Sequence, residues 1–185
     1  MNDCPTPPPA ALPPLKLAGR ELLPIVQGGM GVGISGHRLA GTVAGCNAVG
    51  TLSAADARRS HADLMEKTKH VGTDEAAKQL INDVNLEALA REIGKAKALA
   101  GGRGLIAVNV MRAVADYARL VRQACESGAD VIVVGAGLPL DLPELTAEFP
   151  QVAIVPILSD ARGIALVMKK WERKGRLPDA IIIEH

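Results

Sequence analysis

The sequence predicts an α/β fold built on a parallel sheet, and three observations support this prediction. Nearly half of the 185 residues are apolar but only 2% are aromatic, so the core must consist mainly of Val, Ile, Leu and Ala. Strands buried on both faces of a parallel sheet have this composition. Short β-branched runs alternate with helical patterns along the chain. Apart from one gap, the runs recur roughly every 25 residues, a spacing typical of compact βα units.

The predicted elements follow in order from these patterns. Apolar, β-branched runs predict strands near residues 24–27, 48–52, 105–109, 131–134, 153–157 and 180–183. Helical spacing of apolar residues predicts helices near 36–44, 86–100, 113–127, 142–148 and 161–174. Asn85 suits the N-cap of the helix that follows it, whereas Gly101-Gly102 and Gly128 stand where helices are expected to end.

The one gap in the repeat is a charged, partly helical insertion at about residues 53–84. Because it follows a strand, it is expected at the carboxyl end of the sheet, where α/β proteins bind ligands. A solvated surface excursion and a lid over a substrate both fit this position. His61 and His70 lie in the insertion, and we expect both to be exposed to solvent, since no neighbouring cluster suggests metal ligation. No metal site is predicted.

The composition limits which partners and which cellular compartment the sequence suits. Residues 1–20 begin with a proline-rich stretch, which predicts an N-terminal tail, and residues 21–185 are expected to form one domain. The net charge of +1 and the lack of a basic stripe argue against nucleic acid as a partner. No apolar run approaches the ~20 residues that span a membrane. Cys4, Cys46 and Cys125 are odd in number and widely spaced, which is typical of reduced thiols in a cytoplasmic protein.

The most informative motif is Gln27-Gly28-Gly29-Met30-Gly31, which closes the first apolar run and precedes a predicted helix. Adjacent glycines at the end of a strand leave backbone N–H groups uncovered. A flat or anionic ligand can therefore approach the main chain there. This arrangement suits a cofactor better than it suits core packing.

Two folds compete for this motif. Gly31-x-Gly33-x-x-Gly36 spells the dinucleotide-binding fingerprint, and Asp56 lies near the distance expected for a ribose-binding acid. However, Asp56 lies beyond its strand, and Gly28 and Gly29 are unnecessary for the fingerprint. Polar or glycine-rich groups also end the later strands, at Asn109, Gly135-Ala136-Gly137, Ser159 and Glu184. A site supplied by nearly every strand end favours a TIM-type (β/α)8 barrel.

Four stretches carry a family resemblance. They are Leu23-Pro-Ile-Val-Gln-Gly-Gly-Met-Gly31, Ala107-Val-Asn-Val-Met111, Gly135-Ala-Gly-Leu-Pro139 and Ile154-Val-Pro-Ile-Leu-Ser159. In this order, each at a strand end, they resemble the nitronate monooxygenases, formerly called 2-nitropropane dioxygenases. The resemblance implies a flavoprotein barrel that binds FMN and oxidises a small alkyl nitronate or nitroalkane with dioxygen. Association into a homo-oligomer stays open.

The resemblance also implies site residues. Gly28, Gly29 and Met30 match the segment that lies against the flavin ring, and Asn109 matches a strand-end Asn that contacts FMN. Gly135 and Glu184 match further cofactor-side positions. The alternatives are a strand-terminating turn former at Asn109, an ordinary βα turn at Gly135 and a solvent-facing carboxylate at Glu184. No catalytic residue is assigned, because the family's catalytic His lies beyond His185, which stands where the family commonly has Gly.

The predicted barrel is incomplete. About six strands are predicted, whereas such a barrel has eight strands in ~250 residues and commonly holds phosphate near the last two. We therefore expect the N-terminal part of an enzyme, with two unpaired sheet edges, that by itself binds FMN poorly and does not oxidise nitronates. A flavin-dependent enoyl-ACP reductase, which would need a nicotinamide donor and an acyl-carrier partner, and a non-catalytic remnant or assembly partner without flavin are the alternative functions.

Overall fold

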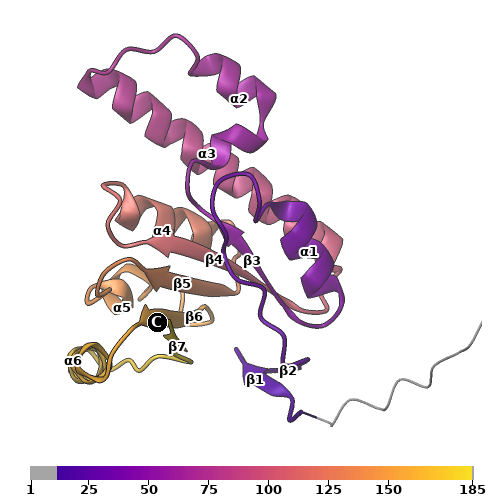
Figure 1. Ribbon diagram of the computed structural model, residues 1–185, viewed down its shortest axis with the longest axis vertical. Helices are drawn as coiled ribbons and strands as arrows, with labels where there is room; N and C mark the ends of the chain where they lie inside the picture. Colours follow the sequence, from indigo (N-terminus) through magenta and orange to yellow (C-terminus); the bar gives the residue numbers. More distant parts are fainter. Residues whose placement is uncertain (1–11, 185) are drawn as a thin grey trace, which may run out of the picture.

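A parallel sheet in chain order forms the centre of the protein (Figure 1). The computed structural model describes residues 12–184; Cys4, His185 and most of the predicted tail lie outside the described residues. The five strands are β3 (Val49–Ser53), β4 (Leu105–Met111), β5 (Val131–Gly135), β6 (Ala153–Leu158) and β7 (Ile182–Ile183), and each pairs in parallel with the next. The fold is therefore α/β, with the curled open sheet of an incomplete (β/α) barrel.

The strand order decides between the two competing folds. A dinucleotide-binding sheet reverses its strand order at a switch point and carries helices on both faces. Here the order β3-β4-β5-β6-β7 never reverses. The fingerprint at Gly31–Gly36 therefore does not mark a Rossmann domain. Asp56 pairs instead with two neighbours, since its Oδ1 lies 2.7 Å from Arg58 Nε and its Oδ2 lies 2.5 Å from Arg59 Nε.

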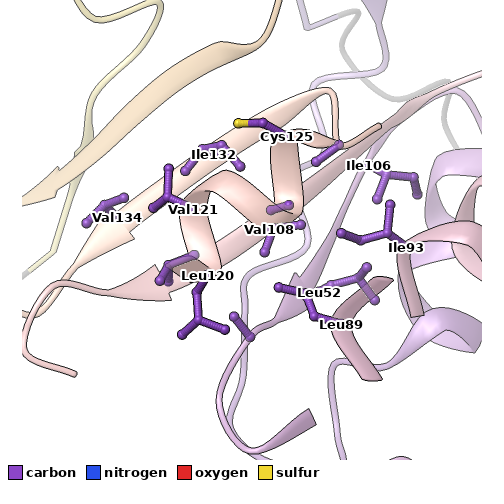
Figure 2. Packing of buried hydrophobic residues seen from close by; sticks show 14 of the residues in the cluster. Leu52, Leu89, Ile93, Ile106, Val108, Leu120, Val121, Cys125, Ile132 and Val134 are labelled. Atoms are coloured by element: carbon purple, nitrogen blue, oxygen red, sulfur yellow. The ribbon is translucent and has the colours of Figure 1, made fainter. Parts of the chain in front are cut away.

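The main helices cover the outer face of the sheet. They are α1 (His37–Gly45), α3 (Glu75–Ala100), α4 (Tyr117–Glu126), α5 (Leu142–Leu145) and α6 (Ala161–Glu172). Alternate strand residues point outward because side chains alternate across a strand. Figure 2 shows this outer core, in which Leu52, Ile106, Val108, Ile132 and Val134 of the strands pack with Leu89, Ile93, Leu120, Val121 and Cys125 of α3 and α4. These side chains are buried.

The other strand residues form an inner core closed by a hairpin that the sequence did not predict. Strands β1 (Leu15–Leu17) and β2 (Arg20–Leu22) pair antiparallel and overlap the end of the segment assigned to the tail. Leu17 and Leu22 pack with the inward-facing residues Val49, Leu105, Ala107, Val131, Val133, Ala153 and Val155. Arg20 Nη1 donates to Gly104 O at 2.9 Å, which holds the hairpin beside the start of β4.

The predicted elements match the structure, with differences at their ends; helix α4, for example, begins at Tyr117, four residues after its predicted start. The first predicted strand is reduced to a single parallel bridge between Val26 and Val49, flanked by the hydrogen bonds Val49 N to Ile25 O (3.0 Å) and Gln27 N to Val49 O (2.9 Å). Pro24 has no N–H to extend this pairing. The last predicted strand shortens to the two residues of β7. The largest difference is the start of α3.

Helix α3 begins eleven residues before its predicted start near residue 86. Asp74 is its N-cap and accepts a hydrogen bond from Ala77 N at 2.8 Å. The prediction that Asn85 is the N-cap is wrong: Asn85 lies inside α3, and its Oδ1 accepts from Arg58 N at 3.2 Å. The insertion thus contains a 3-10 turn (Ala57–Ser60), α2 (Ala62–Lys67) and the start of α3. No helix within residues 12–184 is long and apolar enough to cross a membrane.

His61 is buried, contrary to the prediction that it is exposed. Its side chain is only 5% exposed, and Nε2 lies 3.1 Å from Glu92 Oε1 of α3. His70 is exposed, as predicted. Burial lowers the pKa of His61 below its ordinary value of 6.5; Lys95 and Arg91 act in the same direction, and Glu92 and Asp63 oppose them. His61 therefore favours its neutral form in the folded protein.

Helix α1 approaches the sheet and α3 at backbone contact. A Cβ at Gly50 of β3 would lie 1.9 Å from Ala40 O, and one at Gly104 would lie 2.3 Å from Ala44 O. Toward α3, a Cβ at Gly41 of α1 would lie 2.9 Å from Ala96 O. Real Cβ atoms cannot occupy such positions, so these glycines fix how closely α1 packs.

Substitution at Gly50 tests this packing. Gly50→Ala should lower the free energy of unfolding by about 2 kcal/mol or more, because the backbone of α1 must move away from β3. The matched control is Gly94→Ala on the exposed face of α3, where a Cβ meets no atom within 4 Å. That change should stabilise the protein by about 0.5–1 kcal/mol through helix propensity. Urea unfolding measures both, and equal stability of the two variants would contradict the close contact.

Burial of His61 predicts a pH dependence of stability. An unfolded chain protonates His61 near its ordinary pKa of 6.5, whereas the folded chain resists protonation until the pH is lower. The free energy of unfolding should therefore be highest above pH 6.5 and fall as the pH drops below it. His61→Gln should remove this part of the slope, and His70→Gln should keep it. Urea titrations from about pH 7.5 to pH 5.5 measure the difference; identical slopes in wild type and His61→Gln would contradict it.

Candidate functional site

The predicted site residues on the strands face the inside of the curled sheet at its carboxyl end. Inward-facing residues alternate along each strand, and in β4 they continue from Ala107 to Asn109 and Met111. Register places Asn109 beside Val133, and Met111 beside Gly135. On β7 the same alternation leads from Ile182 to Glu184. The carboxyl ends of parallel strands meet at one edge of the sheet, so these positions lie around one opening there, which we call the mouth.

The Gly28–Met30 turn lies against Asn109 at this mouth. Asn109 Nδ2 donates to Gly29 O at 3.3 Å, across 80 residues of chain. A Cβ at Gly29 would lie 2.5 Å from Asn109 Cβ, so only glycine allows this approach. Gly29 and Asn109 therefore lie together at the same end of the sheet. Asn109 keeps one amide hydrogen and its Oδ1 for a further partner.

Two polar side chains, Ser35 and Gln27, hold the turn in place. Ser35 Oγ accepts from Met30 N at 2.8 Å and donates to Gly28 O at 3.3 Å. Gln27 Oε1 accepts from Thr51 N at 2.9 Å, and Gln27 Nε2 donates to Thr51 O at 3.1 Å and to Gly28 O. Ser35 and Thr51 are buried. The two carbonyls of the turn therefore point into the protein, toward Gln27, Ser35 and Asn109.

The N–H groups of Gly28 and Gly29 are left for another partner. Within residues 12–184, neither group donates to a protein acceptor. A Cβ at Gly28 would meet no atom within 4 Å, so the space beside this residue is open. The exposed side chains of Met30 and Met111 add apolar surface nearby along the chain and on β4. The turn thus offers two backbone donors beside an open, partly apolar space.

Gly135 and Glu184 lie at another part of the mouth. A cavity of about 440 Å³ is lined by Ala136–Leu138, Ile157–Asp160, Gly163 and Glu184. Gly135 itself packs against Ile157, whose Cδ1 would lie 3.1 Å from a Cβ at that position. Gly135 O accepts from Arg112 N at 2.8 Å. Packing against Ile157 thus explains why glycine, without a side chain, stands at position 135. Glu184 borders the cavity.

Arg112, the residue after β4, already has partners within the protein. Its guanidinium carbon lies 4.6 Å above the ring of Tyr117, and Nη2 lies 3.3 Å from Asp141 Oδ2. Burial raises the pKa of the Tyr117 hydroxyl well above its ordinary value of 10.0, and Asp141 adds to the effect while Arg112 opposes it. Tyr117 therefore stays neutral, and the charge of Arg112 is compensated by Asp141.

Comparisons with known proteins agree with this geometry. Two solved structures, FabK from Thermotoga maritima and a mutant of it, have TM-scores of 0.59 at 20% and 19% identity; each match covers 86% of this chain and 40% and 42% of the respective FabK chain. The chain thus spans about two fifths of the FabK length, and the likeness shows a shared fold. No curated protein sequence matches significantly.

Nitroalkane oxidase from Streptomyces ansochromogenes matches at a TM-score of 0.35 and 15% identity, over 86% of this chain and 64% of that chain; this similarity is too low to support an argument.

The comparison with protein families decides the assignment. A model of the family described as nitronate monooxygenase matches residues 18–184, nearly the whole chain. The resemblance inferred from the four strand-end motifs is confirmed, and monooxygenases are oxidoreductases. The protein therefore belongs to the nitronate monooxygenase family.

Proposed function

We propose that the mouth beside the Gly28–Met30 turn binds the ring of FMN, and that the protein is a flavin-dependent oxidoreductase that oxidises alkyl nitronates with dioxygen. The observation that carries the proposal is the pair of unengaged N–H groups at Gly28 and Gly29 beside the amide of Asn109. Membership of the nitronate monooxygenase family supports the reaction class.

The residues at the mouth fit a flavin ring in shape and in chemistry. The ring is flat and apolar on its faces, and its pyrimidine edge carries acceptors and a donor. Backbone N–H groups at Gly28 and Gly29 match the acceptors, and Asn109 Oδ1 matches a donor. The open space beside Gly28 lets the ring approach the main chain, which a side chain there would prevent.

Bound FMN supplies the redox chemistry, since it takes electrons from an organic substrate and passes them to dioxygen. The protein binds and orients the ring. Gln27 and Ser35 keep the Gly28 carbonyl turned inward, so the Gly29 N–H on the other side of the same trans peptide is directed away from them. Asn109 does the same for Gly29 O and can contact the ring edge with its remaining groups. Apolar side chains at Met30 and Met111 exclude water from the ring faces.

Two further cofactor contacts are proposed at greater distance from the turn. Glu184 borders the cavity beside Ser159 and can accept hydrogen bonds from hydroxyl groups of the FMN chain. Gly135 O is already engaged by Arg112 N, so Gly135 is proposed to contribute through its small size alone. We propose no catalytic base within residues 12–184.

Substitutions at the turn test the cofactor site. Gly28→Val should leave the stability of the ligand-free protein unchanged, because the space is open, but should weaken FMN binding at least about tenfold by filling that space. Asn109→Ala should weaken binding by about 1–3 kcal/mol, the cost of an unpaired buried polar group. Gly72→Val is the control, since its surroundings are also open. Fluorescence titration of the protein at its full natural length measures the affinities; unchanged affinity in both site variants would refute the site.

Three measurements distinguish nitronate oxidation from the two alternatives, enoyl reduction and a barrel remnant without flavin. Visible flavin absorbance in the purified protein distinguishes a flavoenzyme from a barrel remnant without flavin. Oxygen consumption with an alkyl nitronate is expected for the proposed reaction. NAD(P)H oxidation that depends on an enoyl thioester would instead indicate the enoyl reductase alternative. Protein that carries flavin and consumes no oxygen with any nitronate would contradict the proposed reaction while leaving the cofactor site intact.

A further inference from the structure

A buried carboxylate stands at the start of α1, where the loop after the Gly28–Met30 turn ends. Glu92 of α3 is 4% exposed, and its Oε2 accepts from His37 N, the first N–H of α1, at 2.7 Å. The N-cap residue Gly36 has no side chain to serve this N–H. Glu92 thus caps a helix that begins 55 residues earlier in the chain.

The imidazole of His37 hydrogen-bonds this carboxylate, and that of His61 lies beside it without forming a hydrogen bond. His37 Nδ1 lies 3.0 Å from Oε1 and 2.9 Å from Oε2, and His61 Nε2 lies 3.1 Å from Oε1. An ionised carboxylate can only accept hydrogen bonds, so His37 carries its proton on Nδ1. The positive end of the α1 dipole also favours a negative charge at this point. Glu92 therefore joins α1, α3 and the insertion at one buried point.

Glu92 contacts α1 at His37, two residues after Ser35, whose hydroxyl holds the Gly28–Met30 turn and is called the Ser35 clamp below. Ser35 immediately precedes Gly36 and His37, and its hydroxyl holds both Met30 N and Gly28 O. Ser35 O also accepts from Ser53 N at 3.1 Å, which ties it to β3. A Cβ at Gly36 would lie 3.2 Å from Glu92 Oε2, so the backbone passes close to the carboxylate. Movement of the start of α1 would therefore move Ser35.

We propose that Glu92 is a positioning residue for the FMN-binding turn: it fixes the start of α1 and thereby the Ser35 clamp that orients Gly28 and Met30. The inference rests on the proposed flavin site for its functional meaning. Its structural content, the control of one loop by a carboxylate on a distant helix, can be tested without any cofactor. The competing explanation is that tight packing of α1 at Gly41 and Gly50 fixes the loop without Glu92.

Hydrogen exchange of the ligand-free protein separates these explanations. Glu92→Ala should raise the exchange of amides in residues 28–36 at least about tenfold, while amides of β4, β5 and β6 keep their protection. Glu92→Gln retains an oxygen that can accept from His37 N and should give a smaller increase. Nitrogen chemical shifts of the His37 ring should report the Nδ1-protonated form in wild type and a smaller share of it in Glu92→Ala, which has no acceptor for this proton. The control is Glu87→Gln, a partly exposed carboxylate on the same helix that pairs with Lys67 and Arg91.

FMN titration of the protein at its full natural length then tests the functional meaning. If wild type binds FMN, Glu92→Ala should bind it about tenfold more weakly, and Glu87→Gln should bind it as wild type does. Unchanged exchange in residues 28–36 in both Glu92 variants would overturn the proposal. Exchange that rises equally throughout the sheet in Glu92→Gln, or rises locally without loss of FMN affinity, would also overturn it. Failure of wild type to bind FMN would refute the cofactor site, and the exchange data would still decide the role of Glu92 in the loop.

Discussion

The close packing of α1 is the constraint on which the candidate site depends. Gly50 and Gly104 bring the sheet to backbone contact with α1, and Gly41 does the same for α3. A helix held this closely has little freedom to slide, so its first residue, His37, has a defined place. The polar contacts of Ser35 and Glu92 then act on a fixed backbone. Packing of small residues thus prepares the geometry that the hydrogen bonds complete.

The mouth combines a rigid polar network with groups left free for a ligand. Gln27, Ser35 and Asn109 engage the carbonyl groups of the turn and leave the N–H groups of Gly28 and Gly29 unengaged. A ligand that accepts two hydrogen bonds therefore meets donors that are already oriented, and little ordering of the protein is needed on binding. The same network explains why two glycines stand together: Gly29 makes room for Asn109, and Gly28 leaves room for the ligand.

The sequence predicted the architecture well because the responsible signals are local. Short β-branched apolar runs, and helical spacing between them, identified the members of the parallel sheet, and the strand-end groups pointed to Asn109 and the Gly28–Met30 turn. The errors arose where local signals compete. Asn85 and Asp74 both suit an N-cap, and contacts with the rest of the fold favoured Asp74. The hairpin at Leu15–Leu22 was missed because its strands are three residues long and follow a proline-rich stretch.

By itself the sequence determined the fold class, the order of the strands along the chain and the edge of the sheet where the site lies, since each follows from periodicity and from parallel direction. Only the tertiary structure decided which side chains hold the turn. The Asn109–Gly29 contact spans 80 residues, the Glu92–His37 contact spans 55, and the Gln27–Thr51 contact spans 24. Glu92 and His61 occupy positions that a surface helix and a charged loop would also allow, and their burial results from the packing of α3 against α1 and against the 3-10 turn at Ala57–Ser60. Such contacts depend on how the elements pack in space, and no local pattern of residues records that packing.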